Sequence, residues 1–216
     1  EEKLTARQLI KNSNVTFICT TDNPTDTLEW HKAIAEDETF DVAVVPGFRP
    51  DEAFAIQDAA KFAGFIGKMQ EATGKEMTTF AEMLDGMEER SQYFADHGSN
   101  VSDHGLSQIY YAEATDEEIE AIYAKAIAGD SISEAEYAKY QTRLLVELGK
   151  IYAAKDFVMQ LHFGAIRNNN KRMFAKLGAD AGFDSIQDQP NVSYALNNLL
   201  GAMDLTNELP KFIAYN

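Results

Sequence analysis

Cysteine, basic side chains and long apolar runs are all scarce in this sequence. The single cysteine, Cys19, excludes an intramolecular disulfide and favours a reducing compartment. No apolar run approaches the ~18 residues that a membrane-spanning helix needs. The 19 basic side chains are outnumbered by 35 acidic ones, which leaves a formal net charge of −16. This charge argues against a nucleic-acid partner, because phosphate backbones are bound by basic patches.

Targeting features are also missing from the start of the chain. It opens with Glu1, Glu2 and Lys3, without an initiator methionine and without a signal peptide. We therefore expect a cytoplasmic protein of which these 216 residues are a piece. Hydrophobic residues make up 45% of the chain and aromatic residues 11%, which is enough for a packed core and excludes general disorder.

Apolar, β-branched runs alternate with helix-compatible segments along the chain. This alternation is typical of parallel strands joined by crossover helices, so the predicted class is α/β. The predicted strands cover residues 15–20, 42–45, 100–102, 157–163 and 212–215. The predicted helices cover residues 1–11, 26–35, 50–68, 78–94 and 191–203, with two more between 113 and 150. We expect one domain, residues 1–216, with no internal repeat.

The stretch 113–150 is expected to form an acidic helical insertion in this domain. Residues 113–136 contain eight acidic side chains and one basic one, which we interpret as a solvated helical face rather than an interaction surface. Two Ser/Thr-x-x-Glu patterns predict capped helix starts, at Thr115 with Glu118 and at Ser133 with Glu136.

Polar side chains follow each predicted strand. They are Asp22, Arg49, Asp103 with His104, His162 with Arg167, and Asn216. Enzymes with a (β/α)₈ barrel build their active sites at these carboxyl ends, whereas an open doubly wound sheet has one crevice. A barrel takes eight strands and typically ~250 residues, so the pattern leaves open a partial barrel or an open sheet.

Two histidines are candidates for chemistry at these strand ends. Val158, Gln160 and His162 alternate along a strand and therefore share one face. A Gln and a His on the same face of a buried strand need polar partners or a ligand, and a satisfied core histidine is the alternative for His162. His104 and its neighbour Asp103 are placed in a turn after their strand, where they serve either function or turn geometry.

Two arginines are candidates for binding a carboxylate. Arg167 is followed by three asparagines, of which Asn168 is the first, and a guanidinium matches a carboxylate in a bidentate manner. A solvated loop is the alternative there, and a salt bridge with Asp51 is the alternative for Arg49. Cys19 is interpreted as a small core residue and His31 as a packing or helix-surface residue.

Several motifs, in order along the chain, resemble the uronate isomerase family. They are Thr20-Thr21-Asp22 with Glu29-Trp30-His31, then Phe48-Arg49-Pro50-Asp51, then Ser102-Asp103-His104-Gly105, and finally Leu161-His162-Phe163-Gly164 with Arg167-Asn168-Asn169-Asn170. The resemblance implies an amidohydrolase-like (β/α)₈ barrel, of which this chain holds about five of the eight strands. It also implies interconversion of D-glucuronate with D-fructuronate, and of D-galacturonate with D-tagaturonate, in sugar-acid catabolism.

The resemblance also suggests roles for individual residues. His162, His104 and Asp103 are expected to be catalytic, and Arg167, Arg49 and Asn168 to bind substrate. The family implies a divalent metal of the zinc type in the intact protein, without assigning its ligands here. Family members are roughly twice this length and carry a His-x-His motif on their first strand and an acidic residue on their last, neither of which is present in this chain.

The expected partners and the competing functions follow from these observations. The expected ligand is a small-molecule uronate, with neither nucleic acid nor membrane as a partner. We expect a homo-oligomer, or association with the missing part of the parent chain, and an isolated chain that is inactive. A metal-dependent hydrolase of the amidohydrolase type is the second hypothesis, and a non-catalytic truncated domain is the third.

Overall fold

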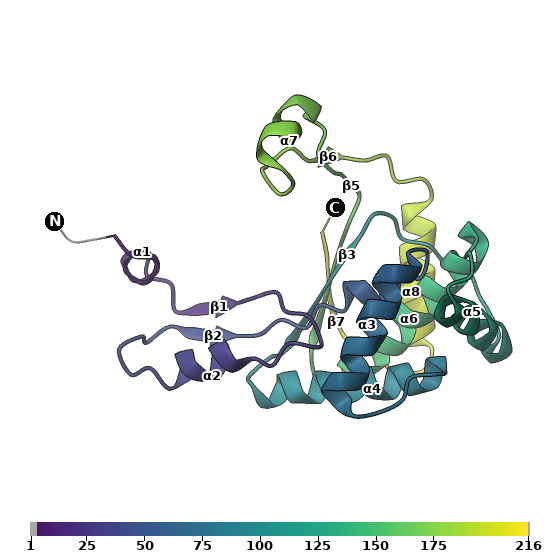
Figure 1. The fold of residues 1–216 in the computed structure, drawn as a ribbon, viewed down its shortest axis with the longest axis horizontal. Helices are drawn as coiled ribbons and strands as arrows, with labels where there is room; N and C mark the ends of the chain where they lie inside the picture. Colours follow the sequence, from purple (N-terminus) through teal and green to yellow (C-terminus); the bar gives the residue numbers. More distant parts are fainter. Residues whose placement is uncertain (1–3, 216) are drawn as a thin grey trace.

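Parallel strands form the centre of the computed structural model, which describes residues 4–215 (Figure 1). Asn216 lies outside the described residues. Strand β1 (Phe17–Cys19) pairs in parallel with β2 (Ala43–Val45). Strand β4 (Val158–Phe163) lies between β3 (Val101–Leu106) and β7 (Lys211–Tyr215) and is parallel to both.

Single backbone bridges at Phe48 connect the two sheets. Phe48 forms parallel bridges to Asp22 on one side and to Ser102 on the other. The five strands are therefore parallel neighbours in chain order, which confirms the predicted α/β class. The strands of residues 4–215 do not close into a barrel.

Helices connect the strands, largely where the sequence predicts them. They are α1 (Ala6–Asn12), α2 (Glu29–Ala35), η1 (Asp51–Phe54, a 3₁₀-helix), α3 (Ala59–Thr73), α4 (Phe80–Asp96), α5 (Asp116–Ala128), α6 (Glu134–Ala154), α7 (Lys171–Leu177) and α8 (Val192–Asp204). The capping boxes predicted for α5 and α6 are present, and α4 has a third, from Thr79 and Glu82. None of the described helices is long and apolar enough to cross a membrane.

Two predicted helix starts differ from the structure. The helix predicted from Pro50 is divided into η1 and α3, because the side chain of Asp58 accepts a hydrogen bond from the Lys61 N–H and starts a new helix there. Helix α2 begins at Glu29 rather than near Asp26. The Asp26 carboxylate accepts from the Leu28 N–H, and Leu28 has φ +54°, so this turn precedes the helix.

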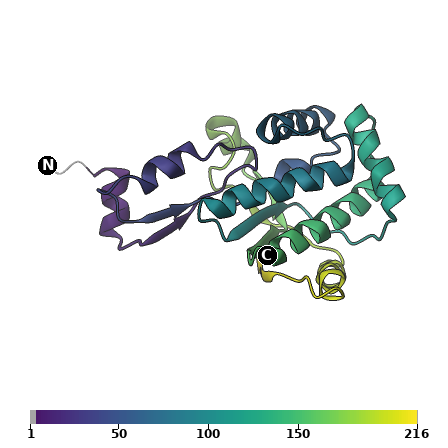
Figure 2. The same ribbon diagram turned by 90° about the horizontal axis from the view of Figure 1, so that it is seen from below.

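Helices cover one face of the β3-β4-β7 sheet and leave the other open. Along β4 the side chains of Met159, Leu161 and Phe163 are buried in the main core, whereas those of Gln160 and His162 are half-buried on the opposite face. This alternation is the signature of a sheet packed on one side. Helices α4 and α6 lie side by side over the buried face (Figure 2).

The segment between β4 and α8, where no strand or helix is predicted, contains regular secondary structure. It contains β5 (Ala165–Ile166) and β6 (Ser185–Ile186), which pair antiparallel around α7. These elements are too short to give a clear sequence pattern, because each strand has two residues and α7 has seven. Asn170 caps α7 by accepting from the Met173 N–H. Asparagine is common both at helix N-caps and in turns, so it does not predict a helix by itself.

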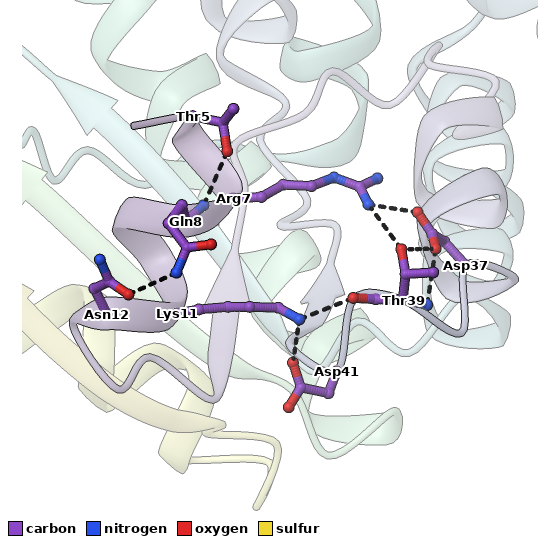
Figure 3. A network of polar contacts seen from close by, with 8 residues as sticks. All are labelled: Thr5, Arg7, Gln8, Lys11, Asn12, Asp37, Thr39 and Asp41. Carbon is purple, nitrogen blue, oxygen red and sulfur yellow. Dashed lines mark hydrogen bonds and ion pairs between the residues drawn. The ribbon is translucent and has the colours of Figure 1, made fainter. Parts of the chain in front are cut away.

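The β1–β2 pair extends as an arm away from the helical body (Figure 1). Its outer end is tied together by ion pairs from α1 to the segment before β2, Arg7 with Asp37 at 2.5 Å and Lys11 with Asp41 at 3.2 Å (Figure 3). Cys19 is exposed in this arm, so its interpretation as a core residue is wrong. No helix covers that face of β1 in the described residues, and Phe17 is exposed on the same face.

Candidate functional site

Strand β3 is longer than predicted, and this decides the positions of two candidate residues. Asp103 and His104 lie inside the strand rather than in a turn after it, because β3 continues to Leu106. Consecutive strand residues point to opposite faces of a sheet. Asp103 is half-buried on the open face, while His104 is completely buried on the face that the helices cover.

Three of the predicted site residues meet on the open face. Arg49 Nη1 lies 3.3 Å from Asp103 Oδ2, and His162 Nε2 lies 3.2 Å from Asp103 Oδ1. They come from the segment after β2, from β3 and from β4, which are neighbours in space although more than 100 residues separate the outer two in sequence. All three side chains are partly exposed, so a ligand can reach them.

Asp51 is a fourth member of this cluster. Its Oδ2 accepts from Arg49 Nε at 2.7 Å, so the salt bridge considered as the alternative role for Arg49 is present together with the contact to Asp103. Burial raises the pKa of Asp51, and hydrogen bonding to Arg49 opposes that rise. The Arg-Pro-Asp spacing was the sequence signal for Asp51.

Gly105 forms the floor of this cluster. A Cβ at this position would come within 2.5 Å of Arg49 Nη2 and 2.7 Å of His162 Cε1. Both side chains therefore pack directly over the glycine backbone. A side chain at residue 105 would have to displace the guanidinium or the imidazole.

His104 does not reach this cluster. Its ring packs edge-on against Phe54 and at a tilt against Tyr152, with centroid separations of 6.1 and 5.6 Å. Neither ring nitrogen has a hydrogen-bond partner among the described residues. Burial lowers the pKa of His104 to about 3, with smaller contributions from Arg49 and His162, so the ring is neutral and packed in the core near neutral pH.

A cavity of about 290 Å³ lies beside the cluster. His162, Arg167 and Tyr215 line it together with the backbone around Gly105. Arg167 Nη1 forms an ion pair with Asp184 at 2.5 Å and is more than half exposed. A larger open cavity of about 690 Å³ lies against α4, away from the strand ends, and we place the candidate site at the smaller one.

Asn168 contributes to this region through its backbone. It has φ +58°, and its N–H donates to Asp184 Oδ1 at 3.0 Å. This hydrogen bond and the one from Arg167 lower the pKa of Asp184. Asn168 thereby helps to hold the carboxylate that pairs with Arg167, while its side chain is not among those that line the cavity.

A second polar cluster joins the ends of β1 and β2, and sequence reasoning missed its histidine. Thr20 Oγ1 lies 2.7 Å from His31 Nε2 and donates to Asp22 Oδ2 at 2.6 Å. The Asp22 carboxylate also accepts from the Gly47 N–H, and its backbone oxygen accepts from the Arg49 N–H at 2.9 Å. His31 is therefore part of the hydrogen-bond network behind Arg49, and its place after Thr20-Thr21-Asp22 in the family motif was the available signal.

The described residues do not make a complete metal site. No three His, Cys, Asp or Glu side chains converge within residues 4–215. Asp103 and His162 are one close carboxylate–imidazole pair, whereas zinc sites generally take three or four protein ligands. This donor set does not fit a zinc ion by itself.

Comparisons with known proteins agree on one family. The profile described as glucuronate isomerase matches residues 1–216. The uronate isomerase of Photorhabdus laumondii is 46% identical over 211 residues, which are 97% of this chain and 44% of that protein. The uronate isomerase of Lachnoclostridium phytofermentans is 44% identical over 216 residues, which are 100% of this chain and 46% of that protein.

Solved structures give the same result for the fold. The uronate isomerase of Thermotoga maritima superposes with a TM-score of 0.87 at 28% identity, covering 99% of this chain and 46% of that one. The glucuronate isomerase of Caulobacter crescentus superposes with a TM-score of 0.84 at 26% identity, covering 100% of this chain and 44% of that one. The chain thus spans slightly less than half the length of the relatives it matches, and over that span it belongs to the glucuronate isomerase family.

Proposed function

We propose that the intact protein containing these residues interconverts an aldose and a ketose uronate, D-glucuronate with D-fructuronate and D-galacturonate with D-tagaturonate. The observation that carries the proposal is the meeting of Arg49, Asp103 and His162 beside a cavity that Arg167 also lines. Family membership supports the same reaction class.

The reaction needs groups that move a proton. Transfer of a carbonyl between C1 and C2 removes a proton from one carbon and returns it to its neighbour, while the oxygen protons rearrange. His162 and Asp103, 3.2 Å apart, form an imidazole–carboxylate pair of the kind that serves in general acid–base catalysis. We assign His162 to the proton transfer and Asp103 to holding its ring in place.

The substrate also needs a group that recognises its carboxylate. These 216 residues have a net charge of −16, so they do not attract an anion over long range, and local arginines must do so. Arg167 lines the cavity and is more exposed than Arg49, so we assign Arg167 to the carboxylate of the sugar acid. Arg49 is assigned to a substrate oxygen near the reacting carbons.

The competing hydrolase hypothesis is less well supported by this arrangement. A metal-dependent hydrolase would use several converging metal ligands and would not require a carboxylate clamp. Arg49 and Arg167 would then be expected to lie far from the histidines. Instead, Arg167 and His162 line the same cavity, and Arg49 contacts the carboxylate that contacts His162.

The larger architecture belongs to the same proposal. We infer that the five parallel strands are part of a (β/α)₈ barrel, with the open face of β3, β4 and β7 turned toward its interior. The metal of the zinc type that the resemblance implies would then need ligands from other parts of the parent chain. Cytoplasmic location and assembly into a homo-oligomer complete the proposal.

Solvent exchange tests the reaction class. The intact enzyme is incubated with D-glucuronate in D₂O, and product formation and deuterium at C1 of the ketose product are followed by NMR. We expect His162→Asn to lower kcat by about 10²–10⁴-fold, the usual contribution of a general acid or base. His97→Asn, at the end of α4 where Nδ1 contacts the Tyr93 carbonyl, is the matched control and should leave kcat unchanged. Equal turnover by wild type and His162→Asn would refute the assignment.

A further inference from the structure

A side chain continues the backbone bridge between Phe48, in the segment after β2, and strand β3. Phe48 N–H donates to the Val101 carbonyl, and the Asp103 N–H donates to the Phe48 carbonyl at 2.9 Å. Two residues further along β3, the Gly105 N–H points to the same side, but the neighbouring chain has already turned away at Pro50 into η1. The carboxylate of Asp51 accepts that N–H, with Oδ1 at 3.2 Å and Oδ2 at 3.3 Å.

The same carboxylate holds the guanidinium of Arg49. Asp51 Oδ2 accepts from Nε at 2.7 Å, and the side chain of Asp51 is about three-quarters shielded from solvent. Asp103 Oδ2 approaches Nη1 at 3.3 Å, so two carboxylates hold the guanidinium at different nitrogens. An arginine side chain is otherwise flexible, and holding it before a ligand arrives reduces the cost of binding.

The backbone of Gly105 completes this arrangement from below. Nη2 of Arg49 lies directly over it, as the 2.5 Å approach to an added Cβ indicates. Asp51 therefore links the Gly105 backbone to the Nε edge of Arg49. With Nε taken, the terminal Nη groups are the donors that remain for a ligand.

We propose that Asp51 is the positioning residue of this site, which fixes the Arg49 guanidinium across the end of β3 so that Arg49 meets its ligand through the Nη groups. Asp51 itself does not contact the ligand in this proposal. The identity of the ligand rests on the proposed function, whereas the role of Asp51 toward Arg49 rests on the geometry alone.

The first experiment measures Asp51→Asn in the intact enzyme with D-glucuronate. An amide keeps the shape and can still accept from Gly105, but it loses the charged hydrogen bond to Nε. We expect KM to rise about tenfold or more while kcat changes less than about threefold, because losing a charge-assisted hydrogen bond weakens positioning rather than chemistry. Glu52→Gln removes the same charge one residue along η1 and should leave both constants unchanged.

A double-mutant cycle then tests whether Asp51 acts through Arg49. In an Arg49→Gln background, Asp51→Asn should change KM by less than about twofold, because non-additivity marks residues that act together. If Asp51→Asn raised KM by the same factor in Arg49→Gln as in the wild type, the proposal would be overturned. A fall in kcat at constant KM in Asp51→Asn would also overturn it. If Asp51→Asn does not fold, Asp51→Glu is measured in its place with the same expectation, because the longer side chain cannot meet Gly105 and Nε together.

A second readout separates this proposal from the proposed function. The ¹⁵N-labelled Nε–H of Arg49 should give a slowly exchanging NMR signal in wild type and in Glu52→Gln, and should lose that protection in Asp51→Asn. Protection that survives in Asp51→Asn would refute the positioning role. A wild-type enzyme that protects Nε–H but does not isomerise uronates would refute the proposed function and leave the role of Asp51 standing.

Discussion

Asp103 and His104 are adjacent in the chain, and the pleat of β3 gives them opposite environments. Asp103 faces the open side and pairs with Arg49 and His162. His104 faces the helices and is completely buried, with neither ring nitrogen hydrogen-bonded within residues 4–215. A buried polar group without a partner costs about 1–3 kcal/mol, so His104 is a point of weakness in the core.

Lowering the pH should destabilise the protein through His104. Its pKa is about 3 in the folded state and 6.5 as the reference value, so between these values the unfolded chain binds a proton that the native chain does not. Stability therefore rises with pH through this window, by up to about 1.4 kcal/mol per pH unit, and the full contribution is present above it. In His104→Leu this dependence should be absent.

Urea unfolding of wild type and His104→Leu across the window measures this effect. The wild-type free energy of unfolding should fall more steeply with decreasing pH than that of the variant. Identical slopes in the two proteins would exclude His104 as the source of the pH dependence.

Arg167→Lys should weaken uronate binding in the intact enzyme. Lysine keeps the charge but loses the planar fork, and a charged hydrogen bond is worth about 1.5–3 kcal/mol, or roughly 10–100-fold in KM. Neutral sugars lack the carboxylate and should be insensitive to the change. Arg172→Lys, on the exposed side of α7, is the matched control. Unaltered KM for D-glucuronate in Arg167→Lys would remove Arg167 from the site.

At the scale of elements, the approach of α8 to α6 depends on one glycine. A Cβ at Gly149 would come within 2.1 Å of Met203 Sδ, and both residues are buried. Gly201, on α8, is exposed, and a Cβ at this position would have no heavy atom within 4 Å. The two helical glycines therefore form a matched pair, in which only Gly149 is required by packing.

Alanine should have opposite effects at these two positions. Gly201→Ala should stabilise the protein by about 0.5–1 kcal/mol, because alanine has the better helix propensity. Gly149→Ala has the same propensity gain, but overpacking of this kind costs about 1–3 kcal/mol, so we expect net destabilisation. Thermal unfolding of both variants measures the difference. A more stable Gly149→Ala would show that Met203 repacks without strain.

At the scale of the whole molecule, the fold is packed on one side only. The open face of β3, β4 and β7 carries the candidate site and also Ile213 and Tyr215, which are 41% and 47% exposed. The chain covers less than half of the relatives it matches. An exposed apolar sheet face and unpaired strand edges favour association with other chains.

The isolated 216-residue chain should therefore self-associate and lack isomerase activity. Analytical ultracentrifugation should show species larger than a monomer, and a D-glucuronate assay with added divalent metal should show no turnover. The intact parent protein, assayed in parallel, is the control. A monodisperse monomer would contradict the association, and turnover near that of the parent would show that the rest of the protein is not needed for catalysis.

Hydrophobic periodicity and capping patterns by themselves determined the α/β class, the positions of the five strands along the chain and the starts of α5 and α6. These features depend on neighbours in sequence: apolar runs for strands, and Thr115 or Ser133 three residues before a glutamate. Because Arg49, Asp103 and His162 follow or end predicted strands, the sequence placed them at the carboxyl end of the sheet, and the resemblance of their motifs to a family indicated the chemistry.

Tertiary structure alone decided which of these side chains meet. The extension of β3 past Ser102 depends on pairing with β4, residue by residue to Phe163, and that pairing turned His104 into the core. The roles of Asp51 and His31 depend on contacts with Gly105 and Thr20 that no local pattern specifies. Sequence patterns report the preferences of a segment, whereas these contacts join segments that become neighbours only when the sheet has formed.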